Sequence, residues 1–395
     1  MWKKHYVILT PFFPSATTFA GPFILDQAVA IQKTGLYDVI VIRLSAYGPD
    51  KSYTYEGIVV HHLCILDLPS FLLPGVFNRY NVKKVILKLK QLTNNKLESI
   101  RYVHGHVGYP SGVLAVSIAQ KAGGMSIVQH HGLDVMGYTN GRLHKGLLRR
   151  MHNNWIRRRH LPWLNKAGWN VGVSQKTLRA LHNVKGYCNK NEYVLYNGVD
   201  FQKFYPIPGL RDPERFTIGC IANFWPIKDQ ITLIKAVAKV VADPAYHNLI
   251  LKFVGSGATL QSCQEYVSGH HLERHIIFLP TAQHIALCRF YNTLDLFVLP
   301  SYYEAFGCVY TEAYCCGVPF IAVSGQGISE IIAPENRSLQ LISKSDVTQL
   351  AELIKYYYQH RDILPELLID CDINHLVADF FSVIKAGEQS KEDAE

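Results

Sequence analysis

The sequence predicts an α/β protein with two Rossmann-like parallel-sheet domains. Three observations support this class. The chain has 395 residues, which exceeds the usual size of one domain, short β-branched runs alternate with helical patterns, and the alternation comes in two series. Apolar residues make up 48% of the chain and charged residues 18%, so two cores can be buried and extended disorder is excluded.

The first series occupies the N-terminal half of the chain. Its apolar runs are separated by helical patterns such as residues 23–35 and 110–124. Strands joined by helical crossovers pair in parallel, so these runs predict the first sheet. The predicted strands are residues 5–10, 37–44, 102–106, 126–132, 169–174 and 193–200.

The second series repeats this alternation. It starts with a strand-like run at residues 216–222 and a helical pattern at 229–243. The later predicted strands are residues 249–257, 275–280, 296–301 and 319–324. Ligands of open parallel sheets bind beyond the carboxyl ends of the strands, so two facing sheets predict a working site in the cleft between the domains.

Both periodicities break at the stretch FYPIPGLRDPERF, where three prolines and a glycine occur close together. We therefore predict a first domain over residues 1–205, a linker over 206–215 and a second domain over 216–370. Residues 371–395 are predicted to form a helical segment that returns toward the first domain.

Charge and cysteine usage suggest a partner and a compartment. From Val135 to Asn191 the chain has twelve Lys and Arg residues and no Asp or Glu, which indicates an anionic partner: a phosphate-bearing substrate, lipid head groups or nucleic acid. The nine cysteines are odd in number and lack a Cys-x-x-Cys spacing, which favours reduced thiols in the cytosol. Pro11 interrupts the first apolar run, and no run reaches about 18 apolar residues, so neither a signal peptide nor a membrane span is predicted.

The stretch EAFGCVYTEAYCCG places two glutamates around a Phe-Gly pair, directly after a buried-type strand. Glu304 is predicted in the loop at the carboxyl end of that strand and Glu312 on the following helix. The amides of Phe306, Gly307 and Cys308 would form the helix N-terminus, which favours a phosphate. A carboxylate beside a bound nucleotide can accept hydrogen bonds from two ribose hydroxyls, and one in the loop can accept from sugar hydroxyls. For an arbitrary pair of glutamates, a helix charge and a solvated face would be the commoner explanation.

With Gly317-Val-Pro and Gly325-Gln-Gly327 following, the stretch resembles the E-x7-E element of the retaining glycosyltransferases of family 4. The resemblance covers nearly the whole chain and implies the GT-B architecture and a nucleotide-sugar donor. It also implies that Glu304 contacts the donor sugar and that Glu312 contacts the ribose. The amides of residues 306–308 would contact the sugar and the diphosphate.

Other stretches are similar to family motifs in the same order. His131-Gly-Leu-Asp134 resembles HG-x-D, which implies that His131 lies beside the transferred sugar. Gly21 resembles the loop glycine whose amide meets the donor phosphate or the acceptor. Lys228 stands at the position of the family's lysine for the leaving diphosphate, whereas Asn223 stands where the family has arginine. Asparagine donates a hydrogen bond but brings no charge, which lowers the expected stabilisation of the leaving group.

The resemblance implies retention of anomeric configuration, and a front-face mechanism is favoured over a covalent glycosyl-enzyme. Lys228, the helix amides and Asn223 would stabilise the diphosphate, which would accept the proton of the acceptor hydroxyl, while the His131 region supports the sugar. No metal or other cofactor is expected. The Asp370-Cys371-Asp372 stretch matches the D-x-D of metal-dependent transferases but falls in a predicted helix, and His104 and His106 could share a zinc only with further ligands.

Two segments are candidates for a membrane surface. Residues 142–166 carry eight of the basic residues with Trp155 and Trp163, and residues 78–92 place apolar side chains on one helical face beside lysines. Solvated charged faces explain such runs equally often. A lipid-linked acceptor would explain both segments and would place the protein peripherally at the inner face of the plasma membrane.

The leading hypothesis is a transferase that moves a hexose from a UDP- or GDP-sugar to a growing glycan, in capsule, lipopolysaccharide or exopolysaccharide synthesis. Alternatives are a nucleotide-sugar epimerase and a degenerate, non-catalytic relative. A hydrolase is disfavoured because paired carboxylates must oppose each other across a bond. Nucleic-acid binding is disfavoured because no recognisable motif accompanies the basic block.

Overall fold

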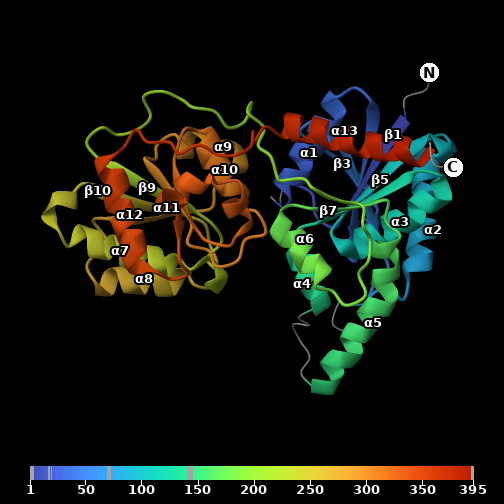
Figure 1. The fold of residues 1–395 in the computed structure, drawn as a ribbon, viewed down its shortest axis with the longest axis horizontal. Coiled ribbons are helices and arrows are strands. Elements are labelled where there is room, and N and C mark those ends of the chain that lie inside the picture. The colour runs from blue at the N-terminus through green and yellow to red at the C-terminus, as the bar shows by residue number, and fades with distance from the viewer. Residues whose placement is uncertain (1–3, 17, 19, 69–72, 140–145, 393–395) are drawn as a thin grey trace. The chain divides into compact units, whose positions relative to one another are not determined.

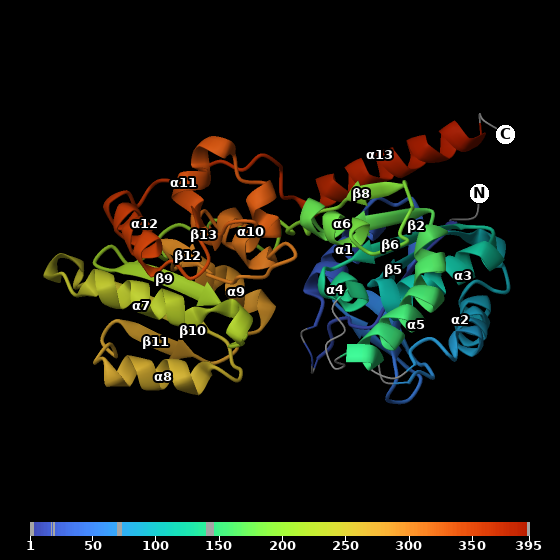
Figure 2. The ribbon, with the colours of Figure 1, turned by 60° about the horizontal axis from the view of Figure 1, so that its bottom comes forward.

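The computed structural model describes residues 4–16, 18, 20–68, 73–139 and 146–392. The chain forms two compact units, Met1–Tyr196 with Ile373–Glu395, and Asn197–Asp372. Each unit has a central sheet with helices on both faces (Figures 1 and 2). The predicted class, α/β with two parallel-sheet domains, is confirmed.

The sheet of the first unit has eight strands in the order β3-β4-β2-β1-β5-β6-β7-β8. Neighbours are parallel except β3 and β4, which pair antiparallel at one edge. The strand order reverses between β1 and β5, so ligands are expected beyond the carboxyl ends of these two strands. The strands are β1 (Lys4–Thr10), β2 (Tyr37–Ser45), β3 (Lys51–Tyr55), β4 (Ile58–Cys64), β5 (Ile100–His106), β6 (Met125–His130), β7 (Trp169–Gly172) and β8 (Glu192–Val194).

The helices of the first unit cover both faces of this sheet (Figure 1). They are α1 (Pro22–Lys33), α2 (Asn78–Leu92), α3 (Val113–Ala122), α4 (Leu133–Thr139), α5 (Gly146–Asn165), α6 (Gln175–His182) and α13 (Ile373–Glu392). Short turns lie at Leu97–Ser99 and Gly108–Gly112. Local chemistry fixes the ends: Pro22 opens α1, and the hydroxyl of Ser174 accepts a hydrogen bond from the Thr177 amide at the start of α6.

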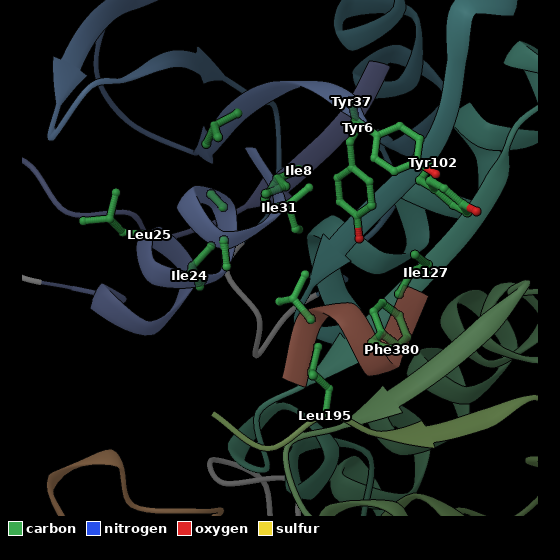
Figure 3. Close-up of a cluster of buried hydrophobic side chains, with 14 of the residues drawn as sticks. Tyr6, Ile8, Ile24, Leu25, Ile31, Tyr37, Tyr102, Ile127, Leu195 and Phe380 are labelled. Atoms are coloured by element: carbon green, nitrogen blue, oxygen red, sulfur yellow. The ribbon is translucent and has the colours of Figure 1, made fainter. Parts of the chain in front are cut away.

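Alternate residues of β1 contribute to two separate cores. Tyr6 and Ile8 belong to the cluster under α1 and α13, whereas Val7 and Leu9 belong to the cluster under α2 and α3. This follows because successive side chains of a strand point to opposite faces. Figure 3 shows the first cluster, in which the rings of Tyr6 and Tyr102 lie 5.5 Å apart. Full burial of an aliphatic side chain such as Ile8 or Leu9 stabilises the fold by about 1.5–3 kcal/mol.

The sheet of the second unit has six parallel strands in the order β11-β10-β9-β12-β13-β14. Its strand order reverses between β9 and β12. The strands are β9 (Phe216–Ile221), β10 (Leu249–Val254), β11 (Ile276–Leu279), β12 (Leu296–Val298), β13 (Phe320–Val323) and β14 (Leu341–Ile342). The helices are α7 (Gln230–Val241), α8 (Leu260–Gly269), α9 (His284–Tyr291), α10 (Cys308–Cys315), α11 (Arg337–Gln340) and α12 (Val347–Gln359). Short turns lie at Pro226–Lys228, Pro244–Tyr246, Gly327–Glu330 and Pro334–Asn336.

The boundary between the units lies earlier than the sequence predicted. The division falls after Tyr196, and the predicted linker 206–215 belongs to the second unit. The Ile207 amide donates to Oδ1 of Asn292 at 2.5 Å, and the Arg211 guanidinium donates to the Gly317 carbonyl. The prolines interrupt regular secondary structure there, but hydrogen bonds attach the segment to its unit.

The C-terminal helix α13 belongs to the first unit, where it packs against α1. The Glu388 carboxylate of α13 forms an ion pair with Arg101 of β5. The sequence predicted a helical segment over residues 371–395. The helix begins at Ile373, and residues 393–395 lie outside the described part of the chain.

Candidate active site

Lys228 and Glu304 meet beyond the carboxyl ends of β9 and β12, the two central strands of the second sheet between which the strand order reverses. Lys228 ends the turn that follows β9, and Glu304 lies in the loop that follows β12. The two strands are neighbours, so their carboxyl ends bring the side chains together. Nζ of Lys228 lies 2.5 Å from Oε1 of Glu304, and the side chains are 24% and 13% exposed. The pair is thus mostly buried but still open to solvent.

The loop that carries Glu304 is held by the segment after β13. Oε1 of Gln326 accepts a hydrogen bond from the Glu304 amide at 2.9 Å, and Nε2 of Gln326 donates to the Tyr302 carbonyl at 3.1 Å. A Cβ at position 327 would lie 1.9 Å from the Ala305 carbonyl oxygen, so only glycine permits this close packing. The later Gly-Gln-Gly stretch therefore positions the first glutamate.

The start of α10 lies directly after Glu304. Gly307 precedes the helix with a φ of 102°, and a Cβ there would lie 2.7 Å from the Tyr310 ring. Phe306 is buried, and the Tyr310 hydroxyl donates to the Leu299 carbonyl at 2.7 Å, which ties the first turn to the end of β12. The amides of Phe306, Gly307 and Cys308 therefore open a fixed helix whose dipole favours an anion at this end.

Glu312 lies on α10 with only 6% of its surface exposed. Its Oε1 lies 3.0 Å from Nε2 of His284, and its Oε2 accepts a hydrogen bond from the Tyr291 hydroxyl at 2.9 Å. Burial, followed by the proximity of this carboxylate, raises the pKa of Tyr291 well above its usual value. A carboxylate accepts about four hydrogen bonds, so two protein partners leave capacity for ribose hydroxyls. The ribose contact of Glu312 stays a prediction.

Asn223 lies in the loop after β9 and is exposed. Its carbonyl accepts a hydrogen bond from Nε2 of Gln230 at 3.0 Å. The loop is braced by the Gly-Ser-Gly turn after β10, because a Cβ at Gly255 would lie 2.0 Å from the Ala222 carbonyl oxygen. This turn, a weak phosphate-loop signal in the sequence, thus supports the neighbouring loop.

Gly21 lies beyond the carboxyl end of β1 in the first unit. It precedes α1 with a φ of 82°, and a Cβ there would lie 2.8 Å from the Phe12 ring. The rings of Phe12 and Phe23 lie 6.2 Å apart, and the Phe23 ring lies 5.0 Å from that of His131. Aromatic packing therefore brings the predicted loop glycine and the predicted histidine to one edge of the sheet.

His131 lies at the end of a stack of three imidazoles. The His104 and His106 rings of β5 lie 4.4 Å apart, and the His106 and His131 rings lie 5.3 Å apart. Nδ1 of His106 lies 3.1 Å from Nε2 of His131, so one of these nitrogens donates to the other. Burial lowers the pKa of His104 to about 3 and of His131 to about 4, and lowers the pKa of His106 well below its usual value. All three rings are therefore neutral at physiological pH.

Asp134 holds the turn that presents His131. Its Oδ1 accepts a hydrogen bond from the His131 amide at 3.0 Å, and its Oδ2 accepts from the Gly108 amide at 2.8 Å. Oδ2 also lies 3.0 Å from Nδ1 of His130, whose Nε2 lies 3.0 Å from Oδ1 of Asn170. Burial acts to raise the pKa of Asp134, but the His130 contact and the amide lower it to about 2. The Asp134 carboxylate of the HG-x-D motif is therefore ionised, and its hydrogen bonds hold the turn that carries His131.

Four residues that the sequence did not assign to a site contact predicted site residues. In the first unit His106 contacts His131, and in the second His284 and Tyr291 contact Glu312 while Gln326 holds the Glu304 amide. The two-residue spacing of His104 and His106 placed both rings on one face of a strand, which is the signal that could have found His106. No pattern marks His284 and Tyr291, because their contact with Glu312 depends on how α9 packs against α10.

In the part of the chain that the structure describes, no group of three or more His, Cys, Asp or Glu side chains could hold a metal ion. Over the same residues, no helix has both the length and the hydropathy to cross a bilayer.

Comparison with known families identifies two adjoining matches. Residues 21–203 match Glycosyltransferase Family 4, and residues 202–369 match Glycosyl transferases group 1. The D-inositol 3-phosphate glycosyltransferase of Mycobacterium marinum is 30% identical over 172 residues, which are 41% of this chain and 36% of that protein. The GDP-mannose-dependent monoacylated alpha-(1-6)-phosphatidylinositol monomannoside mannosyltransferase of Corynebacterium glutamicum is 32% identical over 215 residues, 48% of this chain and 54% of that protein. The matched stretches thus span about a third to a half of these relatives.

Solved structures resemble the whole chain at low sequence identity. Sucrose-phosphate synthase of Thermosynechococcus elongatus aligns with a TM-score of 0.65 and 18% identity over 98% of this chain and 99% of that one. HepE of Anabaena, solved in complex with UDP and glucose, aligns with a TM-score of 0.63 and 16% identity over 99% of both chains. These likenesses establish the GT-B fold.

Proposed function

The chain belongs to family 4 of the glycosyltransferases, and from this premise we propose that it transfers a hexose-type sugar from a UDP- or GDP-sugar to a hydroxyl of a growing glycan. The proposal includes retention of anomeric configuration without a metal ion. The acceptor glycan belongs to a surface polysaccharide such as capsule, lipopolysaccharide or exopolysaccharide.

The observation that carries the proposal is the Lys228–Glu304 pair beside the start of α10. An ammonium group has three donors, so Lys228 can keep its contact with Glu304 and still donate to a diphosphate. The Glu304 carboxylate contacts Lys228 through Oε1 and has further lone pairs that can accept hydrogen bonds from sugar hydroxyls. A cation, a helix N-terminus and a sugar-binding carboxylate are therefore adjacent, as departure of a nucleoside diphosphate from a hexose requires.

In the proposed mechanism the departing diphosphate is stabilised by Lys228, by the first amides of α10 and by Asn223. The C1–O bond of the donor breaks, the acceptor oxygen bonds to C1 on the same face, and the acceptor proton passes to the diphosphate. The neutral His131 suits a position beside the sugar because a charged imidazolium would repel the cationic, oxocarbenium-like state.

The names of relatives support the donor class. The Corynebacterium glutamicum relative is named for a GDP-mannose donor and a phosphatidylinositol mannoside, and the Anabaena structure contains UDP and glucose. We infer from the first of these, and from the basic segments 78–92 and 142–166, that the acceptor is lipid-linked. The protein would then work at an anionic membrane surface on the cytoplasmic side. Residues 142–145 of the second segment lie outside the described residues.

The alternative is a degenerate relative that binds a nucleotide sugar without transferring it. It is favoured by Asn223, which supplies no positive charge where the family's arginine would, and it predicts nucleotide binding without turnover. An epimerase would instead interconvert free nucleotide sugars.

The test is release of nucleoside diphosphate from a panel of UDP- and GDP-hexoses, with and without a lipid extract as acceptor source. The proposal predicts release from one donor, stimulation by the extract, no effect of EDTA, and an α-linked product from an α-linked donor. Nucleotide binding without release in any mixture would support the degenerate relative, and a converted free nucleotide sugar would support the epimerase.

A further inference from the structure

A cavity of about 340 Å³ lies among helices α2, α3 and α5 of the first unit. Helix α3 packs against both other helices (Figure 2). We propose that this cavity binds the phosphate-bearing headgroup of an anionic membrane lipid, with the start of its hydrocarbon chains against the apolar floor. The proposal deepens the proposed function, since it gives the inferred membrane surface a defined lipid site, and it is tested by binding rather than by transfer.

The rim of the cavity is cationic. Arg79 and Lys83 stand one turn apart on α2, Lys121 stands on α3, and all three are exposed. No carboxylate lines the cavity, and within the described residues none of the three cations forms an ion pair. Two cations spaced by one helical turn, with a third from the next helix, can approach one phosphate from different sides.

The floor of the cavity is apolar. Val82, Val113 and Leu114 are buried, and the half-buried Trp163 of α5 also lines the cavity. A site for inorganic phosphate alone would have polar walls, because phosphate gains nothing from apolar contact. An apolar floor beneath a cationic rim instead matches an amphiphile, and tryptophan favours the depth where headgroups meet hydrocarbon.

Exposed apolar side chains also lie on the segments that lead into α2 and that begin α5, two of the helices whose residues line the cavity. Of the twenty exposed large apolar side chains in the described residues, eight come from two short segments, 73–87 and 147–151. They are Leu73, Val76, Phe77, Tyr80, Leu87, Leu147, Leu148 and Met151. Six of the eight are aliphatic, and aliphatic side chains next to cations favour a bilayer over a nucleic acid, which contacts cations and aromatic rings.

The experiment measures co-sedimentation of the full chain with vesicles of phosphatidylcholine, with and without phosphatidylglycerol. The matched pair is Lys83→Gln, inside the cavity, and Lys90→Gln, exposed on the same helix outside it. We expect binding only to the anionic vesicles, a loss of about fivefold for Lys83→Gln, and less than half that loss for Lys90→Gln. The double variant Arg79→Gln, Lys83→Gln should lose about 25-fold, and its exposed positions leave folding intact.

A second experiment distinguishes lipid binding inside the cavity from binding to charges spread over the surface. Ser117 is half-buried and lines the cavity on α3, so Ser117→Phe fills the space without changing charge. It should abolish binding of a soluble short-chain phosphatidylglycerol. Equal losses for the two lysine variants together with unchanged binding for Ser117→Phe would overturn the proposal. So would competition by inorganic phosphate as strong as that by the short-chain lipid, or stronger binding to single-stranded RNA.

Nucleoside diphosphate binding separates this inference from the proposed function. It should be unchanged in Lys83→Gln and Ser117→Phe, since neither residue belongs to the donor site. If the protein binds nucleotide but not vesicles, only the proposed lipid site is refuted. Vesicle binding without nucleotide binding removes the transferase proposal instead.

Discussion

The ammonium of Lys228 lies 2.5 Å from the carboxylate of Glu304, although 76 residues separate them in the sequence. The two loops follow β9 and β12, which are neighbours at the point where the strand order reverses. An ion pair at such a point is not needed to close the core, since both side chains keep some exposure. The ion pair is placed to bind a ligand that has both an anionic group, which the ammonium attracts, and hydroxyl groups, from which the carboxylate accepts hydrogen bonds.

Replacement of Glu304 by Gln should lower kcat by about 10²–10³, because the amide keeps the shape but loses the charge that accepts from sugar hydroxyls and orients Lys228. The melting temperature should change little. Glu335→Gln, an exposed position of the same unit, is the control and should leave kcat unchanged. Near-normal turnover by the Glu304 variant would remove this residue from the site.

His106 should act as a positioning residue for His131, because the 3.1 Å contact between their nitrogens holds the second ring. In His106→Asn the amide can replace Nδ1, whereas His106→Phe keeps the ring and loses the contact. We expect the Phe variant to lose about tenfold or more in kcat with a similar KM, and the Asn variant to recover most of that loss. Equal kcat for both variants at equal stability would show that His106 only fills space.

Stability should fall as the pH drops below about 6.5, the usual pKa of an unfolded histidine. The folded pKa values of His104 and His131 are about 3 and about 4, so the unfolded chain binds more protons between these limits and stability rises with pH there. Each neutral buried ring contributes up to about 1.4 kcal/mol per pH unit. Urea unfolding of the wild type and of His104→Gln, measured from pH 7.5 to 4.5, should show a steeper slope for the wild type. Identical slopes would contradict the burial of a neutral ring.

Asn223→Arg should strengthen binding of the cognate nucleoside diphosphate, because it adds a charged, forked donor near the predicted phosphate site. We expect up to about tenfold tighter binding by calorimetry. Gln261→Arg, which adds the same charge at an exposed position of α8, controls for a general electrostatic effect. An equal gain in the two variants, or none in either, would show that Asn223 does not face the diphosphate.

The sequence predicted most strands of both sheets, because strand and helix periodicities are local properties of the chain, but it did not predict β3, β4 and β14. It also predicted the loop position of Glu304 and the helical position of Glu312, since a strand end and a glycine mark them. Contacts between segments that are distant in the sequence could not be predicted from these local patterns. Gln326 fixes the Glu304 amide, and His284 reaches Glu312, only through the packing of one loop or helix on another.

The domain boundary shows the same division between local and distant information. Prolines at 206–215 signalled an interruption of regular structure, which is a local property. Whether the segment is a linker depends on its partners, and Asn292 and Gly317 lie far along the chain. A pattern that lacks periodicity therefore does not by itself mark a boundary.

The most direct test of the donor site is thermal stabilisation of the full chain by UDP, GDP, ADP and their hexose conjugates, repeated with Glu312→Ala and Lys228→Gln. A ligand that binds only the folded state raises the melting temperature. We expect one base to be selected, its hexose conjugate to stabilise the protein as well, and both variants to weaken the shift. No shift with any nucleotide, or a shift that survives both substitutions, would contradict it.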